Sequence, residues 1–254
     1  MDNIITAKNL SYSYEDKEIF SEVNLEIDSG DFAALIGPNG SGKSTLLKLI
    51  LGILSYRQGE IKLLGDLVEK FNSWDKIGYI PQDIREFNHS FPATVKEIIA
   101  ANLYQEMGWI KILTKDLEKK IDKALKKVDM IEFKDRLIGQ LSGGQQQRVF
   151  IARTLVTEPE IIFLDEPLAG VDASAEEDFY NLLAELNNQL GITIVMISHN
   201  VNVVSNKANK IICFGDKKIY SHQAENFDYD RYIKEIKNDK AIILPHSHHE
   251  RVEG

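Results

Sequence analysis

The chain contains little cysteine, little proline and no excess of positive charge. One of its 254 residues is Cys and six are Pro, and 30 Lys and Arg face 39 Asp and Glu, for a formal net charge of −9. The lone Cys213 forms no internal disulfide, and its place in the apolar run KIICFGD predicts a small core residue. The acidic balance argues against a general nucleic-acid-binding protein, which needs a basic face.

Long apolar runs are also missing. None approaches the ~20 residues that span a bilayer, and the start, MDNIITAKNL, lacks the basic and then apolar stretches of a signal peptide. We therefore expect a soluble, cytoplasmic protein whose role at a membrane would come through a partner. Hydrophobic residues at 43% and charged residues at 27% are near globular averages, so we expect one large domain, or one with an insertion, around a well-filled core.

Apolar runs alternate with helical patterns and predict an α/β fold. Short β-like runs occupy 4–12, 19–27 and 31–37, with a turn at DSGD, before the pattern becomes helical from Gly42. IIFL and ITIVMI are almost wholly apolar, as expected for parallel strands buried on both faces. The other expected elements are strands at 59–65, 76–82, 160–167 and 192–200 and helices at 43–54 and 175–191.

A block of helices is expected between residues 94 and 140, at 94–107, 114–128 and 130–137. Thr94 with Glu97 three residues later predicts a capping box. The second helix places an apolar stripe on one face and lysines elsewhere, which indicates a solvated face or, alternatively, a face that binds a partner. The stripe consists of Leu117, Ile121, Leu125 and Val128.

The stretch GPNGSGKST predicts a phosphate-binding loop. It fits G-x-x-x-x-G-K-[ST] and lies between an apolar strand and an amphipathic helix, the context that this motif requires. Glycines let backbone N–H groups face phosphate oxygens, and the helix start adds partial positive charge. Lys43 supplies a full charge to the β- and γ-phosphates, and Ser44 is placed to bind Mg²⁺. The sequence therefore predicts a nucleoside triphosphate site.

The strand-like stretch IIFLDEP predicts the second part of that site. A buried strand that ends in Asp165 and Glu166 brings two carboxylates to the edge of a parallel sheet, where ligands bind. Asp165 is expected to hold Mg²⁺ through water. Glu166 is expected to orient or deprotonate the attacking water.

GPNGSGKST, LSGGQQQRV, IIFLDEP and ISHN, in this order, resemble the nucleotide-binding domain of ABC ATPases over about residues 3–220. The resemblance implies a P-loop NTPase core with a parallel central sheet, N-terminal antiparallel strands and an inserted α-helical subdomain at about 84–145. A polar C-terminal extension, residues 221–254, would follow the ABC ATPase domain of residues 1–220.

The same resemblance implies a role for single residues. Tyr14 would stack on adenine, with Tyr12 as a less favoured candidate, while Gln82 would contact Mg²⁺ and the attacking water. Asp172 matches a loop that crosses between two subunits, and His199 matches the residue that contacts the γ-phosphate. ATP and Mg²⁺ are the implied cofactors. The nucleotide contacts in the phosphate loop would come from Gly37, Pro38, Asn39, Gly40, Ser41, Gly42, Lys43, Ser44 and Thr45.

The stretch LSGGQ indicates a second, weaker anion site. Ser142 is predicted to cap a helix, and Gly143 and Gly144 leave backbone amides unobstructed at its start, followed by Gln145. This site has no lysine and no metal ligand. The resemblance implies that it closes over the γ-phosphate of ATP held by Lys43 of another copy, so that two chains arranged head to tail form two complete sites.

Three less specific sequence similarities bear on the transported substrate. FNHSFPATVKEII, GWIKILTKD and EPLAGVDASAEEDFYNLLAEL are similar to the ATPases of zinc and manganese uptake systems. They imply an integral membrane permease as partner, indirectly a substrate-binding protein, and a position on the cytoplasmic face of the cell membrane. His246, His248 and His249 in the tail are either incidental or a site for a borderline metal.

Other assignments stay open. An ABC importer for another substrate fits the same motifs, and so does a soluble ABC ATPase without a permease, such as one that serves iron–sulfur assembly. A DNA-repair or chromosome-organising ATPase is disfavoured, because only about a hundred residues without sustained heptads separate GKST from LSGG.

Overall fold

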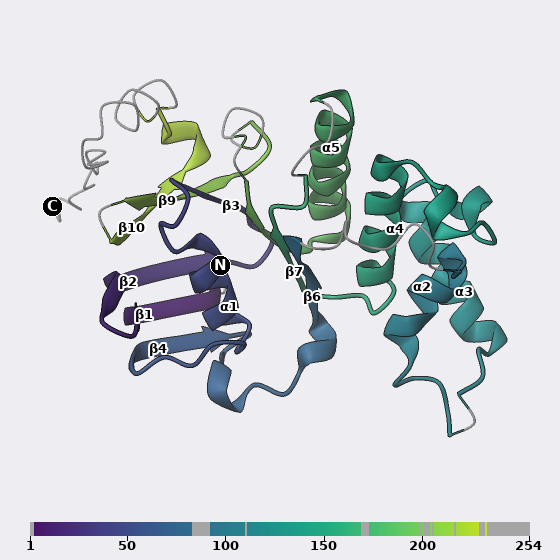
Figure 1. Ribbon diagram of the computed structural model, residues 1–254, viewed down its shortest axis with the longest axis horizontal. Helices are drawn as coiled ribbons and strands as arrows, with labels where there is room; N and C mark the ends of the chain where they lie inside the picture. The colour runs from purple at the N-terminus through teal and green to yellow at the C-terminus, as the bar shows by residue number, and fades with distance from the viewer. Residues whose placement is uncertain are drawn as a thin grey trace, which may run out of the picture.

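The fold combines two sheets with a block of helices at one end (Figure 1). The computed structural model describes residues 3–82, 92–109, 111–168, 173–198, 200, 204, 206–215, 217–228 and 232. Within these ranges no helix is long and apolar enough to cross a bilayer.

The smaller sheet is antiparallel and lies at the N-terminal side of the molecule. Its order is β2-β1-β4-β5, formed by β1 (Asn3–Tyr14), β2 (Lys17–Asp28), β4 (Gln58–Leu63) and β5 (Asp66–Leu67). The burial pattern of β2 alternates at its C-terminal end, where Val23, Leu25 and Ile27 face the core. The predicted N-terminal antiparallel strands are therefore confirmed, and Asp31 N–H donates to the Asp28 carbonyl in the expected DSGD turn (3.1 Å).

The larger sheet confirms the predicted parallel central sheet. Its order is β10-β9-β3-β8-β7-β6, and every neighbouring pair is parallel except β10 with β9. All residues of β3, β7 and β8 are buried, which explains their apolar sequences. The strands are β3 (Phe32–Ile36), β6 (Ile77–Ile80), β7 (Ile161–Asp165), β8 (Thr193–Ile197), β9 (Lys210–Gly215) and β10 (Lys218–Gln223).

The larger sheet separates two hydrophobic cores. Alternate residues of one strand enter different cores, so Leu164 packs with the helices while Phe163 packs with α1 (Lys43–Ile50) and the smaller sheet. Cys213 is buried as predicted, and α5 (Ala173–Leu190) covers the helix-side face. The strand β10 continues past residue 220 to Gln223, so the sheet extends into the segment expected to be a polar extension.

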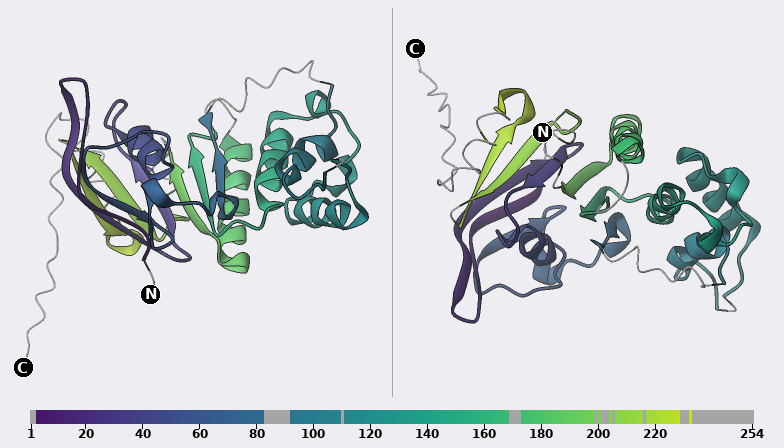
Figure 2. Two further views of the ribbon diagram at one scale, coloured as in Figure 1. Left: turned by 90° about the horizontal axis from the view of Figure 1, so that it is seen from below. Right: turned by 45° about the horizontal axis from the view of Figure 1, so that its top comes forward.

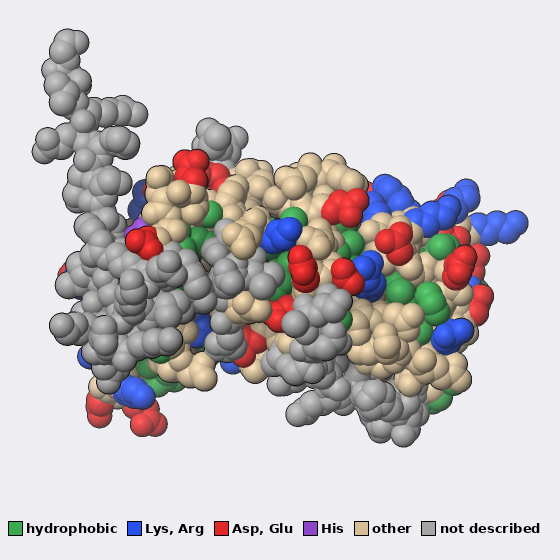
Figure 3. Space-filling view, turned by 90° about the horizontal axis from the view of Figure 1, so that it is seen from above, with side chains coloured by type: hydrophobic (Ala, Val, Ile, Leu, Met, Phe, Trp, Pro, Cys, Tyr) green, Lys and Arg blue, Asp and Glu red, His purple; other side chains and the backbone are tan. Residues whose placement is uncertain are grey.

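The helical block lies beyond β6 and α5 (Figure 2) and contains α2 (Val95–Ala100), α3 (Lys115–Lys127) and α4 (Gly143–Leu155). The predicted capping box at Thr94 is present, with Glu97 as its partner. The apolar stripe of α3 is buried as predicted. Lys and Arg side chains gather at this end of the molecule (Figure 3), where Lys119 and Lys123 pair with Asp116 and Glu158 in exposed ion pairs.

Three expected helices are shorter than predicted or absent. The helix at 43–54 ends at Ile50, because Gly52 adopts φ 65° and the N–H groups of Ile53 and Leu54 turn back to the Lys48 carbonyl. The helix at 94–107 continues after Ala100 only as the 3₁₀ turn η4 (Ala101–Leu103) and further turns.

The prediction of a helix at 130–137 is wrong. The structure has one 3₁₀ turn within these residues, η5 (Ile131–Phe133), and a second, η6 (Ile138–Gln140), directly after them. The chain from Arg136 to Ile138 pairs with the residues before and at the start of α2, since Val95 N–H donates to the Arg136 carbonyl (2.9 Å) and Ile138 N–H donates to the Ala93 carbonyl (2.9 Å). Because these backbone groups already pair with another segment, they cannot form the hydrogen bonds of a continuous helix.

The contact of β6 with α4 predicts a severe effect of Gly78→Ala. A Cβ at Gly78 would lie 2.1 Å from Cγ2 of the buried Thr154 on α4. Because Thr154 is β-branched and packed, we expect a loss of about 1–3 kcal/mol in the free energy of unfolding, measured by urea titration. Gly108→Ala is the control, because its added Cβ meets no atom within 4 Å. Equal stabilities of the two variants would contradict this packing.

Candidate nucleotide site

The loop between β3 and α1 has the backbone of a phosphate cradle. Gly42 stands directly before α1 with φ 103°, and a Cβ there would lie 2.6 Å from Cγ2 of Ile19. Gly37 is equally confined, since its Cβ would lie 2.9 Å from the Phe214 carbonyl oxygen. The loop can take this path only with glycine at these two positions. Because no side chain covers them, the backbone N–H groups near the start of α1 remain accessible to an anion.

The side chain of Lys43, the first residue of α1, reaches back into this loop. This side chain is buried, and Nζ donates hydrogen bonds to the carbonyl oxygens of Gly37 and Pro38, both at 2.9 Å. Burial lowers the pKa of the Lys43 ammonium, while the carboxylates of Glu166 and Asp165 oppose that shift. The loop therefore holds a charged donor at its centre, where a phosphate oxygen can replace the carbonyls.

Ser44 and Asp165 meet across 121 positions of sequence. Ser44 Oγ, in the first turn of α1, donates to Asp165 Oδ1 at the end of β7 (3.0 Å). Burial raises the pKa of Asp165, and the hydrogen bond from Ser44 opposes this effect. A hydroxyl and a carboxylate that already touch form a pair of hard oxygen ligands, the kind that Mg²⁺ prefers.

Glu166 and Gln82 are brought together by neighbouring strands. Gln82 follows β6 and Glu166 follows β7, and Gln82 Nε2 donates to Glu166 Oε2 (3.1 Å). Glu166 adopts φ 49°, a left-handed conformation that is unusual for a residue with a side chain, and its N–H donates to the Ile197 carbonyl (3.2 Å). This strained turn directs the carboxylate toward the phosphate loop, because Glu166 lines the same cavity as Lys43.

Nine of the predicted site residues line one cavity of about 470 Å³, whereas Gly37, Pro38, Ser41 and Asp165 are not among the residues that line it. Ser41 Oγ beside it is buried and has no hydrogen-bond partner among the described residues, as expected for a group that serves a ligand. Tyr14 remains 44% exposed at the rim, available for stacking. The residues that line the cavity are Tyr14, Lys17, Ile19, Asn39, Gly40, Gly42, Lys43, Ser44, Thr45, Gln82 and Glu166.

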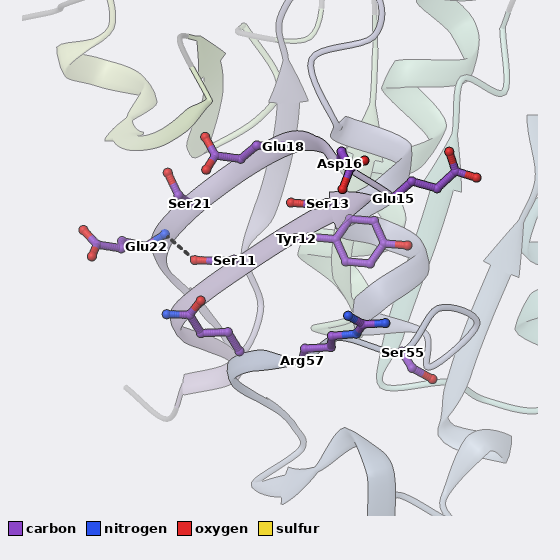
Figure 4. A pocket seen from close by; sticks show the side chains of 11 residues that line it. Ser11, Tyr12, Ser13, Glu15, Asp16, Glu18, Ser21, Glu22, Ser55 and Arg57 are labelled. Atoms are coloured by element: carbon purple, nitrogen blue, oxygen red, sulfur yellow. Dashed lines mark hydrogen bonds between the residues drawn. The ribbon is translucent and has the colours of Figure 1, made fainter.

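Tyr12 lies at a different hollow, of about 760 Å³, between the β1–β2 hairpin and the start of β4 (Figure 4). Its ring meets that of Tyr14 edge-on, with centroids 5.0 Å apart. Figure 4 shows Tyr12 beside Arg57 and Ser55, whereas no residue of the phosphate loop lines this hollow. Of the two tyrosines, Tyr14 is therefore the one placed at the phosphate loop.

Lys17 and Ile19 also line the nucleotide cavity, and sequence reasoning did not find them. They lie on β2 just after the turn of the β1–β2 hairpin, where Lys17 pairs with Tyr14 in the antiparallel register. The short turn at Glu15 and Asp16 could have predicted them, because a hairpin turn there places the next residues opposite Tyr14.

The LSGGQ stretch forms a capped helix start away from this cavity. Ser142 Oγ accepts from Gln145 N–H, and the Gln145 side chain accepts from Ser142 N–H, so the predicted cap is a full capping box. Ser142 and Gly143 are exposed, and a Cβ at Gly143 would meet no atom within 4 Å. None of residues 142–145 lines the cavity that holds Lys43. Asp172, His199 and the tail histidines lie outside the described residues.

Comparison with known proteins identifies this arrangement. The ABC transporter family matches residues 20–169, more than half of the chain. The chain belongs to the ABC transporter family. As an ABC cassette it is an ATP-hydrolysing subunit of a transporter.

Two relatives show which ABC subunits it is similar to. The zinc uptake system ATP-binding protein ZurA of Listeria innocua is 44% identical over 233 residues, which cover 92% of this chain and 90% of that protein. The manganese transport system ATP-binding protein MntB of Halalkalibacterium halodurans is 36% identical over 244 residues, 96% of either chain.

Solved ABC cassettes share the fold. The cassette cbiO1 of Clostridium perfringens, part of an ABC transporter complex, superimposes with a TM-score of 0.80 at 29% identity, covering 94% of this chain and 96% of that one. A dimeric cassette in a post-hydrolysis state with ADP and Pi gives a TM-score of 0.71 at 29% identity, covering 88% of this chain and 100% of that one. Nucleotide binding and a dimeric state thus both occur in cassettes of this fold.

The geometry predicts that Lys43→Met weakens ATP binding without unfolding the protein. Methionine keeps the buried stem but loses the charge that is predicted to meet the phosphates. A charged hydrogen bond contributes on the order of 1.5–3 kcal/mol, so we expect a roughly ten- to hundredfold higher Kd for ATP, measured by calorimetry. Lys8→Met removes the same charge from an exposed position on β1 and should leave the Kd unchanged. An unaltered Kd for Lys43→Met would refute the role of this lysine.

Proposed function

We propose that two copies of this chain form a head-to-tail dimer and hydrolyse ATP at the two interfaces between a phosphate loop and an LSGGQ helix start. The observation that carries the proposal is the separation of two anion sites on one chain. Lys43 and its cavity supply charge, whereas the exposed Ser142–Gly143 helix start supplies backbone amides and lies outside that cavity. A second copy brings the missing half to each.

Each side chain of the site has a task in this reaction. Lys43 is proposed to exchange its two loop carbonyls for oxygens of the β- and γ-phosphates, and Tyr14 to stack on the base at the rim. Glu166 would orient the attacking water and take up its proton, and Gln82, already bonded to that carboxylate, would help to place the water.

The oxygens of Ser44 and Asp165 fit Mg²⁺, and Gln82 is the proposed third contact. When bound, Mg²⁺ would neutralise charge that builds up on the phosphates. Asp172 is proposed at the crossing between subunits and His199 at the γ-phosphate, from the family pattern of the sequence.

Hydrolysis would be coupled to opening of the dimer. The γ-phosphate is proposed to bind both the loop of one copy and the helix start of the other, so that its charge holds the two copies together. Cleavage removes these shared contacts, and the dimer can then relax and move a bound partner.

Glu166→Gln is expected to separate binding from hydrolysis. The amide retains the shape of the side chain and cannot accept the proton of the attacking water. We expect the variant to bind ATP as the wild type does, to hydrolyse it far more slowly, and to accumulate as a dimer in size-exclusion chromatography with ATP. The wild-type chain in ATP, and the variant in ADP, should remain mainly monomeric. Normal turnover by the variant would contradict the assignment.

The proposed cargo is a divalent transition-metal ion, zinc or manganese, taken up through an integral membrane permease. This part of the proposal is supported by the two relatives, which are named for zinc uptake and manganese transport and align over nearly the whole chain. The chain would sit on the cytoplasmic face of the cell membrane, and a substrate-binding protein would deliver the ion from the other side.

Uptake by whole cells tests the cargo. Cells that lack this protein are expected to lose uptake of radiolabelled zinc or of radiolabelled manganese, because the permease has no other source of energy. The wild-type gene should restore uptake, and the Glu166→Gln gene should not. A labelled amino acid serves as the control for general transport. Unchanged uptake of both metals would overturn the metal assignment and would leave the ATPase assignment intact.

A further inference from the structure

Three consecutive glutamines at the start of α4 have three different partners. Gln145 closes the capping box with Ser142. Gln146 Nε2 donates to the carbonyls of Ile138 (3.1 Å) and Leu141 (3.3 Å), within the helical block. Gln147 Nε2 donates instead to the carbonyl of Pro167 (2.9 Å), a buried bond that reaches from α4 to the turn after β7. The third glutamine thus connects the helical block to the turn that carries the catalytic carboxylate.

Pro167 directly follows Glu166, so this bond bears on the strained turn. The Glu166 N–H is held by the Ile197 carbonyl on one side. On the other side the proline ring restricts φ, and the direction of its carbonyl then depends on ψ alone. A hydrogen bond to that carbonyl restrains ψ of Pro167, so the chain is anchored at Glu166 N–H and again at the next residue, on both sides of the Glu166 turn with its φ of 49°.

The cost of burying Gln147 indicates that its amide has a specific task. The residue is 6% exposed, and its Oε1 has no hydrogen-bond partner among the described residues. An unpaired buried acceptor is unfavourable, whereas an apolar side chain of similar length would avoid that penalty. The Gln147 amide offsets this penalty by donating the hydrogen bond to the Pro167 carbonyl.

We propose that Gln147 is a positioning residue that holds the Glu166 turn in its active geometry and couples it to the LSGGQ helix start. This inference rests on the proposed head-to-tail dimer. Gln147 follows Ser142 by five residues, about 7.5 Å along the helix axis. The helix that is proposed to contact the nucleotide of the partner subunit therefore also anchors the turn after β7, which carries Glu166 of its own subunit, and this links the two ATP sites.

The test is Gln147→Met in the full chain, assayed for steady-state ATP hydrolysis. Methionine preserves length and packing and loses the donor. We expect kcat to fall about tenfold, equivalent to about 1.4 kcal/mol in the barrier, because the carboxylate is less well aligned. KM for ATP should stay within about twofold, since the nucleotide contacts are untouched. Cooperativity between the two sites should be lost. Gln146→Met, which breaks bonds only within the helical block, is the matched control.

A double variant separates positioning from simple structural damage. If Gln147 acts through Glu166, Gln147→Met should cause no further loss in a Glu166→Gln background, in which the carboxylate is already absent. Equal losses in both backgrounds, or equal losses for Gln146→Met and Gln147→Met, would overturn the inference. So would an unchanged kcat and retained cooperativity. If the wild-type chain does not hydrolyse ATP and the Glu166→Gln chain does not pair in ATP, it is the proposed function that fails.

Discussion

The site depends on the shared direction of β3, β8, β7 and β6. Because these strands are parallel, their carboxyl ends meet at one edge of the sheet, and the register pairs Leu35 with Ile197, Ile197 with Asp165, and Leu164 with Ile80. Asp165 is the last residue of β7, and the phosphate loop, Glu166 and Gln82 come just after the ends of β3, β7 and β6. Reversing β3, β7 or β6 would carry its functional side chains to the opposite edge, roughly 10 Å or more away at ~3.3 Å per residue.

Two functional groups at that edge are buried, which restricts their motion and makes their charged forms less favourable. Lys43 and Asp165 are almost wholly removed from solvent, which disfavours the charged form of either group. Each is compensated by its surroundings, the ammonium by loop carbonyls and nearby carboxylates, and Asp165 by the Ser44 hydroxyl. The two cores on either side of the sheet hold the strands together, so the fold itself fixes the positions of these polar groups.

The sequence predicted best those elements whose formation depends on residues close together in the chain. The strands at 161–165 and 193–197 were predictable because burial on both faces demands an unbroken apolar run, and the cap at Ser142 because its partner lies three residues away. The helix expected at 130–137 failed for the opposite reason: its backbone pairs with residues 93–95, far along the chain. The bond from Gln147 to Pro167 also joins distant segments, and no local pattern predicts it. Lys17 differs, because its place beside Tyr14 follows from the short turn at Glu15 and Asp16.

The hydrogen bonds of Lys43 have a consequence for the exchange of ligands. The two loop carbonyls give the buried ammonium acceptors that belong to the protein itself. A phosphate oxygen can therefore replace one carbonyl at a time, so that the cation need not lose all of its acceptors during the exchange.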